Sequence, residues 1–379
     1  MDTSINMDPK CREKAPWEDV FHTGPGTTAG RYLRTFWHPV WVASLLKPGR
    51  SKPLKIMNEE FTLFRGEGGK AHLLDFRCRH RGTQLSTGWV EGDEIRCFYH
   101  GWKYGADGQC TEQPNEPKPF CERIKIRSYP VREYLGLIFA YIGEGEPPEF
   151  PLYPDWEKKV QASDYYMREC NYFQHMNNDL AHVPWVHGLR SGETVPLVSM
   201  EETEFGCQAV LPNGRVHIAL FLMPNMAEIT SVNVGRPPYD GRGGALFWRV
   251  PIDDASHYNF SVLSYPGSWT ADGAAEKANH YVREILAGNL HIEDLRDGDM
   301  NILVNVADAL AQCGQGAIYE DWDTENLSRH DGQVVMQRAM WFRELRAMLE
   351  GKPLKKWVRS KPPEAPPEQA ALAVKEVGE

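Results

Sequence analysis

Two cysteine–histidine pairs are the residues whose types and spacing could do chemistry. Cys78 and His80 form a C-x-H pair, and Cys97 and His100 form a C-x-x-H pair, with residues 81–96 between the two. Two thiolates on one iron and two imidazoles on the other iron hold a Rieske [2Fe–2S] cluster, whose reduction potential lies above that of an all-cysteine cluster. The pairs therefore predict an electron-carrying centre.

A structural zinc ion and an accidental grouping are the two alternatives for these residues. Zinc also accepts two cysteines and two histidines, but its usual spacing keeps cysteines with cysteines and histidines with histidines. Here each pair holds one of each type. Gly82 and Gly101 follow the pairs closely, as expected if two tight loops close on a cluster from opposite sides. The spacing therefore favours the iron–sulfur cluster.

A second candidate metal site lies in NYFQHMNNDLAHVPWVHGL, residues 171–189. His182 and His187 are five residues apart, which on a continuous helix would separate them by about 140°. Pro184 disfavours helix just before it and is a good first residue of a new helix, so a break there would let both imidazoles converge. Two histidines and one carboxylate form the facial triad of non-haem Fe(II) oxygenases. The alternative is that His182 and His187 are packing or capping residues and bind no metal. His175, in the same segment, is expected to pack in the interior or to contact a metal ligand without binding the metal.

The carboxylate of such a triad must come from elsewhere in the chain. Asp299 and Asp308 are the candidates, at the start of and within a predicted helix. This helix carries a polar stripe that, on the alternative interpretation, simply faces water, formed by Asn301, Asn305, Asp308 and Gln312. Helical periodicity leaves the choice between the two aspartates open.

Composition limits the class of protein and its partners. The 379 residues, 41% of them hydrophobic, suffice for one large or two ordinary domains. A net charge of -10 argues against nucleic-acid binding. The other cysteines show no spacing pattern, which indicates free thiols in a reducing compartment. Residues 1–20 have no apolar core, and the longest apolar run, Tyr134–Ile142, is too short to cross a bilayer. We expect a soluble cytoplasmic protein with no membrane partner.

Hydrophobic periodicity predicts an α+β protein with four parts. These are an N-terminal segment (1–29), an all-β domain with the cluster (30–150), a second domain (151–350) and a disordered tail (351–379). The strands expected in the first domain are Leu54–Met57, Phe61–Arg65, Ala71–Phe76 and one buried strand over Tyr134–Ile142. An antiparallel sheet is expected from Val216–Leu222, Ala227–Val234, Ala245–Val250 and Tyr258–Tyr265. Helices are expected over Glu276–Leu295, Met300–Cys313 and Gly332–Leu349.

Several segments together resemble the catalytic α subunits of the Rieske non-haem iron ring-hydroxylating oxygenases. GRYLRTFWHPVW is similar to the phthalate-dioxygenase and vanillate-demethylase branch, CRHRGTQL and CFYHGWKY match its cluster loops, and DLAHVPWVH matches its D-x-x-H-x₄-H pattern. The resemblance covers nearly the whole chain. It implies an all-β Rieske domain followed by an α+β helix-grip domain with an antiparallel sheet. It also implies a head-to-tail homotrimer, or a hexamer built from trimers.

The resemblance also assigns site residues. His182 and His187 match the iron ligands, and Asp179 matches a bridging residue that contacts a cluster histidine of the neighbouring subunit, here His100. Counting back from Gln315-Gly316 selects Asp308 as the third ligand. The match departs from the family pattern by one residue around Ala317–Asp321, so Asp299 remains an alternative third ligand.

The implied activity is oxygenation with electrons supplied by a partner. An NAD(P)H-dependent flavin or iron–sulfur reductase, directly or through a ferredoxin, would deliver electrons through the cluster to a mononuclear Fe(II), where O₂ is activated. The substrate would be an aromatic acid or aryl ether that is dioxygenated, mono-oxygenated or O-demethylated. No G-x-G-x-x-G follows a strand, so NAD(P)H oxidation belongs to another polypeptide.

A non-catalytic electron carrier with a ligand- or partner-binding second domain is the alternative function. Three arginines, Arg215, Arg236 and Arg249, could meet a substrate carboxylate, although surface positions are the simpler expectation.

Overall fold

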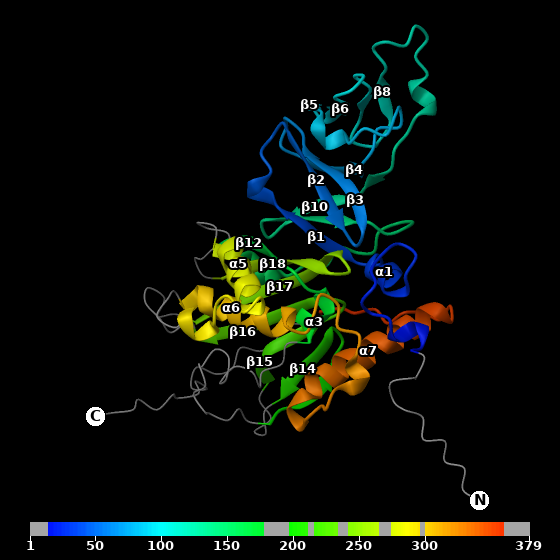
Figure 1. The fold of residues 1–379 in the computed structure, drawn as a ribbon. Coiled ribbons are helices and arrows are strands. Elements are labelled where there is room, and N and C mark those ends of the chain that lie inside the picture. The colour runs from blue at the N-terminus through cyan, green and yellow to red at the C-terminus, as the bar shows by residue number, and fades with distance from the viewer. Residues whose placement is uncertain are drawn as a thin grey trace, which may run out of the picture.

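The computed structural model describes residues 14–177, 197–210, 216–233, 242–264, 274–295 and 300–359 (Figure 1). Three small sheets form the upper part of the view, and one larger sheet with its helices forms the lower part. The expected α+β class, with an all-β part before an α+β part, is confirmed.

The upper part is built from three antiparallel sheets. The first has the order β1 (Trp37–Val42), β11 (Leu137–Tyr141), β10 (Val131–Tyr134). The second has the order β2 (Arg50–Ile56), β3 (Glu59–Arg65), β4 (Ala71–Asp75), β9 (Ser128–Tyr129). The third has the order β5 (Trp89–Glu91), β6 (Glu94–Arg96), β7 (Lys103–Tyr104), β8 (Cys110–Glu112). The three predicted strands between residues 54 and 76 are confirmed.

The apolar run over Tyr134–Ile142 is a hairpin and not the single strand that was predicted. Strand β10 ends at Tyr134, the chain turns at Leu135 and Gly136, and β11 returns beside it. Both turn residues have positive φ, 49° and 76°, which suits a tight two-residue hairpin turn. Leucine seldom adopts a positive φ, and an apolar residue at this position continues the apolar run. The sequence therefore contains no sign of a turn at Leu135.

The lower part is organised around one seven-stranded antiparallel sheet. Its order is β12 (Ala162–Arg168), β18 (Ser256–Leu263), β17 (Arg242–Asp253), β16 (Met226–Asn233), β15 (Val216–Leu222), β14 (Gly206–Val210), β13 (Ser199–Glu202). All four predicted strands of this sheet are confirmed, whereas β12, β13 and β14 were not predicted.

The α-helices are α1 (Thr28–Leu33), α2 (Pro154–Glu157), α3 (Tyr172–Met176), α5 (Ala274–Leu286), α6 (Met300–Cys313) and α7 (Gly332–Leu349). Single 3₁₀ turns are η2 (Pro16–Glu18), η3 (Ala43–Leu45), η4 (Leu85–Thr87), η5 (Cys121–Arg123), η7 (Ile292–Leu295), η8 (Trp322–Thr324) and η9 (Arg329–Asp331). The predicted helices at 300–313 and 332–349 have the bounds expected. The first predicted helix ends early, at Leu286, before Gly288 with φ of 78°. Among the described residues, no helix is both long and apolar enough to cross a membrane.

The large sheet is covered on both faces. On one face, Trp41 of β1 packs against Tyr165, with ring centroids 4.6 Å apart, and Phe139 of β11 packs against Trp248 at 5.7 Å. On the other face, α3 contacts β17 and β18, and α5, which packs against α6, contacts β12 (Figure 1). The upper part and the helices therefore bury opposite faces of one sheet.

The N-terminal segment from residue 14 packs against the lower part. Tyr32 of α1 contacts Trp341 of α7, with ring centroids 5.2 Å apart. The Tyr172 hydroxyl at the start of α3 donates to the Val20 carbonyl at 2.8 Å. These contacts join the segment before the cluster domain to the helix layer that follows it.

Residues 351–359 are ordered, although the tail from residue 351 was predicted to be disordered. Arg359 donates two hydrogen bonds to Asp155, at 2.7 and 3.0 Å, and one to Glu228 at 2.8 Å. Its side chain is 7% exposed and that of Glu228 is 2% exposed. A buried carboxylate needs a charged partner, and the C-terminal segment supplies it. Residues 360–379 lie outside the described residues.

Glu202 on β13 ties the sheet to α7 and to the C-terminal segment. Its carboxylate accepts two hydrogen bonds from Arg343, both at 2.8 Å, and one from Lys355 at 2.6 Å. The hydrogen bonds from Arg343, with those from Lys355, lower the pKa of Glu202 to about 2. Since the folded-state pKa lies below that of the unfolded chain, this stabilisation is present above the ordinary pKa of 4.5 and is lost as the pH falls toward 2.

We expect Glu202→Gln to lower the free energy of unfolding at neutral pH by about 1 kcal/mol, a value reduced for the partial exposure of the pair. As the pH falls from 4.5 toward 2, the variant should also lose less unfolding free energy than the wild type. Urea unfolding at a series of pH values compares the two proteins. Parallel pH profiles would show that the carboxylate contributes nothing in the folded state.

Candidate functional site

The two loops that carry the cysteine–histidine pairs repeat one hydrogen-bond pattern. The N–H of Cys78 and that of Cys97 each donate to the carbonyl five residues later, at 2.9 and 2.8 Å. Gly82 and Gly101, four residues after each cysteine, donate back to the cysteine carbonyls at 2.9 and 3.1 Å. Their φ values of 76° and 74° require glycine, so each loop is closed in the same way.

The cysteines lie inside the loops and the histidines lie outside. Cys78 and Cys97 are each 2% exposed, and their thiols are close enough to hydrogen-bond. His80 and His100 are more exposed, with ring centroids 4.4 Å apart. His80 also stacks on Trp102 at 4.6 Å with an interplanar angle of 7°, which fixes its orientation. The loops thus present two thiols together and two imidazoles together.

The sulfur atoms receive hydrogen bonds from several directions. The Tyr104 hydroxyl lies 3.2 Å from Cys78 Sγ and accepts a hydrogen bond from the Arg79 N–H at 3.1 Å. A cysteine that ligates iron is a thiolate with no proton to donate, so the Tyr104 hydroxyl is the donor to Cys78 when the cluster is bound. Burial raises the pKa of Tyr104, which keeps the hydroxyl protonated and able to donate.

The thiol of Cys97 is the easier of the two to ionise. Its pKa is lowered to about 6, first by the hydrogen bond with the Cys78 thiol and then by the backbone N–H groups of Tyr99 and His100. Thiolates, not thiols, bind metal, so this environment suits a ligand. Within the described ranges, no three side chains of ligating type surround a single point. The loops offer their ligands in pairs.

The segment with His182, His187 and Asp179 lies outside the described residues, and so does Asp299. Helix α3 leads directly into this segment. Its N-cap is Asn171, whose side chain accepts from the Phe173 N–H at 2.9 Å and donates to the Phe21 carbonyl at 2.9 Å. The start of α3 is therefore fixed to the N-terminal part of the chain.

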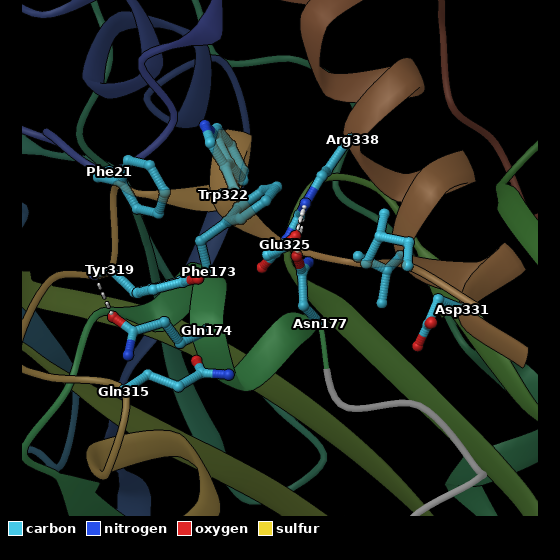
Figure 2. A pocket seen from close by; sticks show the side chains of 12 residues that line it. Phe21, Phe173, Gln174, Asn177, Gln315, Tyr319, Trp322, Glu325, Asp331 and Arg338 are labelled. Atoms are coloured by element: carbon cyan, nitrogen blue, oxygen red, sulfur yellow. Dashed lines mark hydrogen bonds and ion pairs between the residues drawn. The ribbon is translucent and has the colours of Figure 1, made fainter. Parts of the chain in front are cut away.

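A cavity of about 140 Å³ lies where α3 ends (Figure 2). The aromatic rings of Phe21, Phe173 and Trp322 line one part of it. Arg338 of α7 donates to Asn177 Oδ1 at 3.1 Å and pairs with Glu325 at 2.5 Å. Asn177 is the last described residue before the proposed ligands, so Arg338 holds the point from which that segment starts.

The helix-covered face of the large sheet is polar although it is buried. Side chains that are 0–3% exposed on this face are Asp164, Arg168, His257, Asn259 and Ser261, from β12 and β18. Buried polar groups normally have hydrogen-bond partners, so the partner of each of these side chains must be identified.

His257 and His175 form a hydrogen-bonded chain whose protons can be assigned. The Cys170 carbonyl lies 2.8 Å from His257 Nδ1, and a carbonyl only accepts, so Nδ1 carries a proton. Burial, with the nearby arginine charges, lowers the pKa of His257 to about 3 and that of His175 well below its usual range, so both rings are neutral. His257 Nε2 therefore accepts from His175 Nδ1 at 2.8 Å, and the lone pair of His175 is left on Nε2.

The polar stripe of α6 faces the sheet and not water, which corrects the solvent-facing interpretation. Gln312 is 4% exposed, and its Oε1 accepts from Arg168 at 2.5 Å. Asp308, one turn earlier, lies close enough to Tyr166, Arg168 and Arg249 for its charge to act on all three. The candidate third ligand thus lies on the side of α6 that meets the polar face.

Two side chains on this face lack hydrogen-bond partners. Asn259 is 0% exposed, and neither its Oδ1 nor its Nδ2 is bonded. The buried Nε of Arg249 has no acceptor, and desolvation lowers the pKa of Arg249 to about 10. Each unpaired buried group costs about 1–3 kcal/mol. The surface position expected for Arg249 is wrong, while Arg215 and Arg236 lie outside the described residues.

Comparison with known proteins shows the family of this chain. The Rieske [2Fe-2S] domain family matches residues 36–130. The chain is 30% identical over 365 residues to the 5,5'-dehydrodivanillate O-demethylase oxygenase subunit of Sphingobium sp.. The aligned region covers 90% of this chain and 82% of that protein. The chain belongs to the Rieske non-haem iron oxygenases.

Other Rieske oxygenases support this assignment. The phenoxybenzoate dioxygenase subunit alpha of Ectopseudomonas oleovorans is 33% identical over 272 residues, 62% of this chain and 64% of that protein. The terminal oxygenase of carbazole 1,9a-dioxygenase from Novosphingobium sp. KA1 has the same fold, with a TM-score of 0.63 at 20% identity over 88% of this chain and 96% of that chain. The structural-zinc and electron-carrier alternatives are excluded, because Rieske oxygenases carry a [2Fe–2S] cluster and a mononuclear iron.

Inspection of the sequence missed Tyr104 and His257. The only local signal for Tyr104 was its position in the CFYHGWKY motif, near Cys97. His257 had no signal, since it lies 82 residues from the His175 ring that it orders.

Tyr104→Phe should lower the reduction potential of the cluster. A hydrogen bond to a ligand sulfur stabilises the more negative, reduced state, and its loss removes about 1 kcal/mol, or roughly 40 mV for one electron. Protein-film voltammetry measures this shift, and the absorption spectrum of the variant should keep its Rieske shape. Tyr129→Phe, which removes a half-buried hydroxyl bonded to Asp75 at 3.1 Å, is the control and should leave the potential unchanged. An unchanged potential in Tyr104→Phe would contradict the assignment of this hydroxyl as a donor to sulfur.

Proposed function

We propose that this Rieske oxygenase uses O₂ to dioxygenate, mono-oxygenate or O-demethylate an aromatic acid or aryl ether. Its electrons come from a separate NAD(P)H-dependent flavin or iron–sulfur reductase, directly or through a ferredoxin. A Rieske cluster carries single electrons, and a mononuclear Fe(II) with open positions activates O₂. A homotrimer brings the cluster of one subunit to the catalytic site of the next.

The proposed roles of the chain's residues follow from their placement. Cys78 and Cys97, inside the loops, would hold one iron of the cluster, and His80 and His100, outside, would hold the other. Tyr104 donates to the Cys78 sulfur, and Trp102 orients the His80 ring. The cluster domain spans residues 30–150.

The catalytic domain spans residues 151–350 in this proposal. His182, His187 and Asp308 ligate the mononuclear iron, and Asp179 connects the two metal sites. The segment before Asp179 is held by Arg338 at Asn177.

The observation that carries the proposal is the polar face between the sheet and α3 and α6. A domain that only docks a partner has no use for buried arginines, neutral histidines and unpaired amides in its interior. A catalytic pocket does, because it must position a polar substrate away from water. Asp308 lies beside this face, so a ligand on α6 and a substrate on the sheet would be neighbours.

Iron counting combined with isotope labelling tests the function. Anaerobically purified protein should contain three irons per chain, two of them in a cluster with a Rieske spectrum. With a surrogate reductase and a panel of aromatic acids and aryl ethers, one or two oxygen atoms from ¹⁸O₂ should enter a product, or formaldehyde should be released. Two irons and no O₂-dependent product would refute the proposal.

A further inference from the structure

Three residues form one row across the polar face. Arg249 on β17 pairs in register with Asn259 on β18, which pairs in register with Tyr166 on β12. Residues directly opposite each other on antiparallel strands project to the same face, with their Cβ atoms about 5 Å apart. His257 and Arg168 are opposite each other two residues along the same strands, so this row lies on the face that α3 and α6 cover.

The guanidinium of Arg249 lacks the partner that a buried charge needs. No carboxylate among the described residues lies in salt-bridge contact with it, and its buried Nε has no acceptor. The guanidinium carbon of Arg249 lies 5.4 Å from the centroid of the Phe247 ring, which belongs to the same strand and the same face. Arg168, by contrast, has an acceptor in Gln312. A cation that is half desolvated and unpaired indicates a missing anion.

Asn259, beside Arg249, points to the same conclusion independently. Its amide is fully buried, and both its donor and its acceptor are unused. A packed interior with no ligand to bind would favour leucine at such a position. Arg249 and Asn259 are neighbours in one row, and both lack partners, so a single anionic ligand could bind to the two side chains together.

The charge closest to Arg249 is compatible with an anionic ligand. Asp308 is the aspartate whose charge acts on Arg249, and it also acts on Arg168, while the histidines are neutral. Asp164, the other aspartate of this face, lies opposite Ser261 in the next row of the sheet. If Asp308 ligates iron, as proposed above, its charge is already engaged. The aromatic face of Phe247 next to the guanidinium would suit a planar ring attached to the anion.

We propose that Arg249, with the Asn259 amide beside it, binds the carboxylate of an aromatic carboxylic acid and so sets the substrate class of this enzyme. The guanidinium donates two parallel hydrogen bonds to the carboxylate, and Asn259 Nδ2 donates another. The inference rests on the proposed function, which it narrows from aromatic acids and aryl ethers to the acids.

Equilibrium binding without turnover tests this inference. The oxidised, iron-loaded protein is titrated by calorimetry, with no reductant, against benzoate, vanillate and naphthoate and against the carboxamide of each. The wild type should bind at least one acid about tenfold more tightly than its carboxamide, the scale expected for a charge-assisted pair. In Arg249→Gln this preference should vanish while the affinity for the carboxamide stays within about twofold. Arg249→Lys should keep part of the preference, since it keeps the charge but not the paired donors.

Two further variants separate recognition from folding. Arg65→Gln removes a buried arginine of the cluster domain that is fully paired, with Glu133 and backbone carbonyls, and it should lose stability but keep the acid preference. Asn259→Leu should raise the melting temperature of the ligand-free protein and weaken acid binding, a combination that a purely structural amide cannot give.

The inference is wrong if no acid is preferred by the wild type, or if a folded Arg249→Gln keeps the preference. Because the titration needs no electrons, its outcome is independent of the iron count and oxygen incorporation. Three irons and labelled product without acid preference would refute this inference alone, and acid preference in a protein with two irons would refute the oxygenase function alone.

Discussion

Asp308→Ala is expected to abolish product formation while leaving the Rieske absorption spectrum unchanged. In the proposed facial triad, Asp308 is the carboxylate ligand beside His182 and His187. Mutation of a residue that only hydrogen-bonds to a metal ligand costs about 10–100-fold in metal affinity or activity, so loss of the ligand itself should cost at least about 100-fold in activity. Bound iron should fall from three to two per chain. The cluster loops lie in a different part of the fold, with their own hydrogen bonds, so the cluster should persist.

Asp299→Ala is the matched control for this variant. It removes the other candidate carboxylate and should keep three irons and product formation. Asp308 also offsets two arginines, Arg168 and Arg249, so its loss should lower the melting temperature of the catalytic part. Iron content, not stability, therefore decides the outcome. If Asp299→Ala loses the third iron and Asp308→Ala keeps it, the assignment of the ligand is wrong.

Helical stripes and alternating runs made much of the fold predictable. The helices at 300–313 and 332–349 have the predicted bounds, because their periodicity extends over several turns. The same patterns could not predict β12, because its buried positions hold the polar residues Asp164 and Arg168 while the apolar Met167 is 38% exposed. A strand whose buried face is polar lacks the alternation of apolar inward and polar outward residues by which strands are recognised.

The sequence could not predict which polar residues face inward. Arg249 and Gln312 occupy positions that normally face solvent on an amphipathic strand and helix. Gln312 is buried and Arg249 is half-buried because two polar faces meet, one from β12, β18 and β17 and one from α6, and that meeting depends on tertiary packing. The ordering of His175 by His257 is equally non-local. The cluster loops were predictable because their ligands lie close together in the chain.

Asp179→Asn is expected to slow reoxidation of the reduced cluster by at least about 100-fold while preserving three irons per chain. Asp179 lies three residues before His182, so on a helical turn its carboxylate lies beside that imidazole, where it can accept the ring N–H and fix its tautomer. In the resembling oxygenases the matching aspartate also contacts a cluster histidine of the neighbouring subunit. His100 is suited to such a contact, since it lies at the outer side of its loop beside the exposed Tyr99.

The choice of asparagine separates this role from a structural one. Asparagine caps a helix about as well as aspartate, so a capping role would leave the variant unchanged, whereas a role that depends on negative charge would be lost. The measurement is a single turnover of pre-reduced protein with substrate and O₂, in which the cluster absorption reports reoxidation and the product is quantified. Asp331→Asn, which alters the aspartate of the Ser328–Asp331 capping box before α7, is the control and should reoxidise at the wild-type rate. If Asp179→Asn reoxidises its cluster at the wild-type rate and gives the full product yield, Asp179 acts only as a capping residue. Slow reoxidation with three irons bound would identify its charge as the connection between the two metal sites.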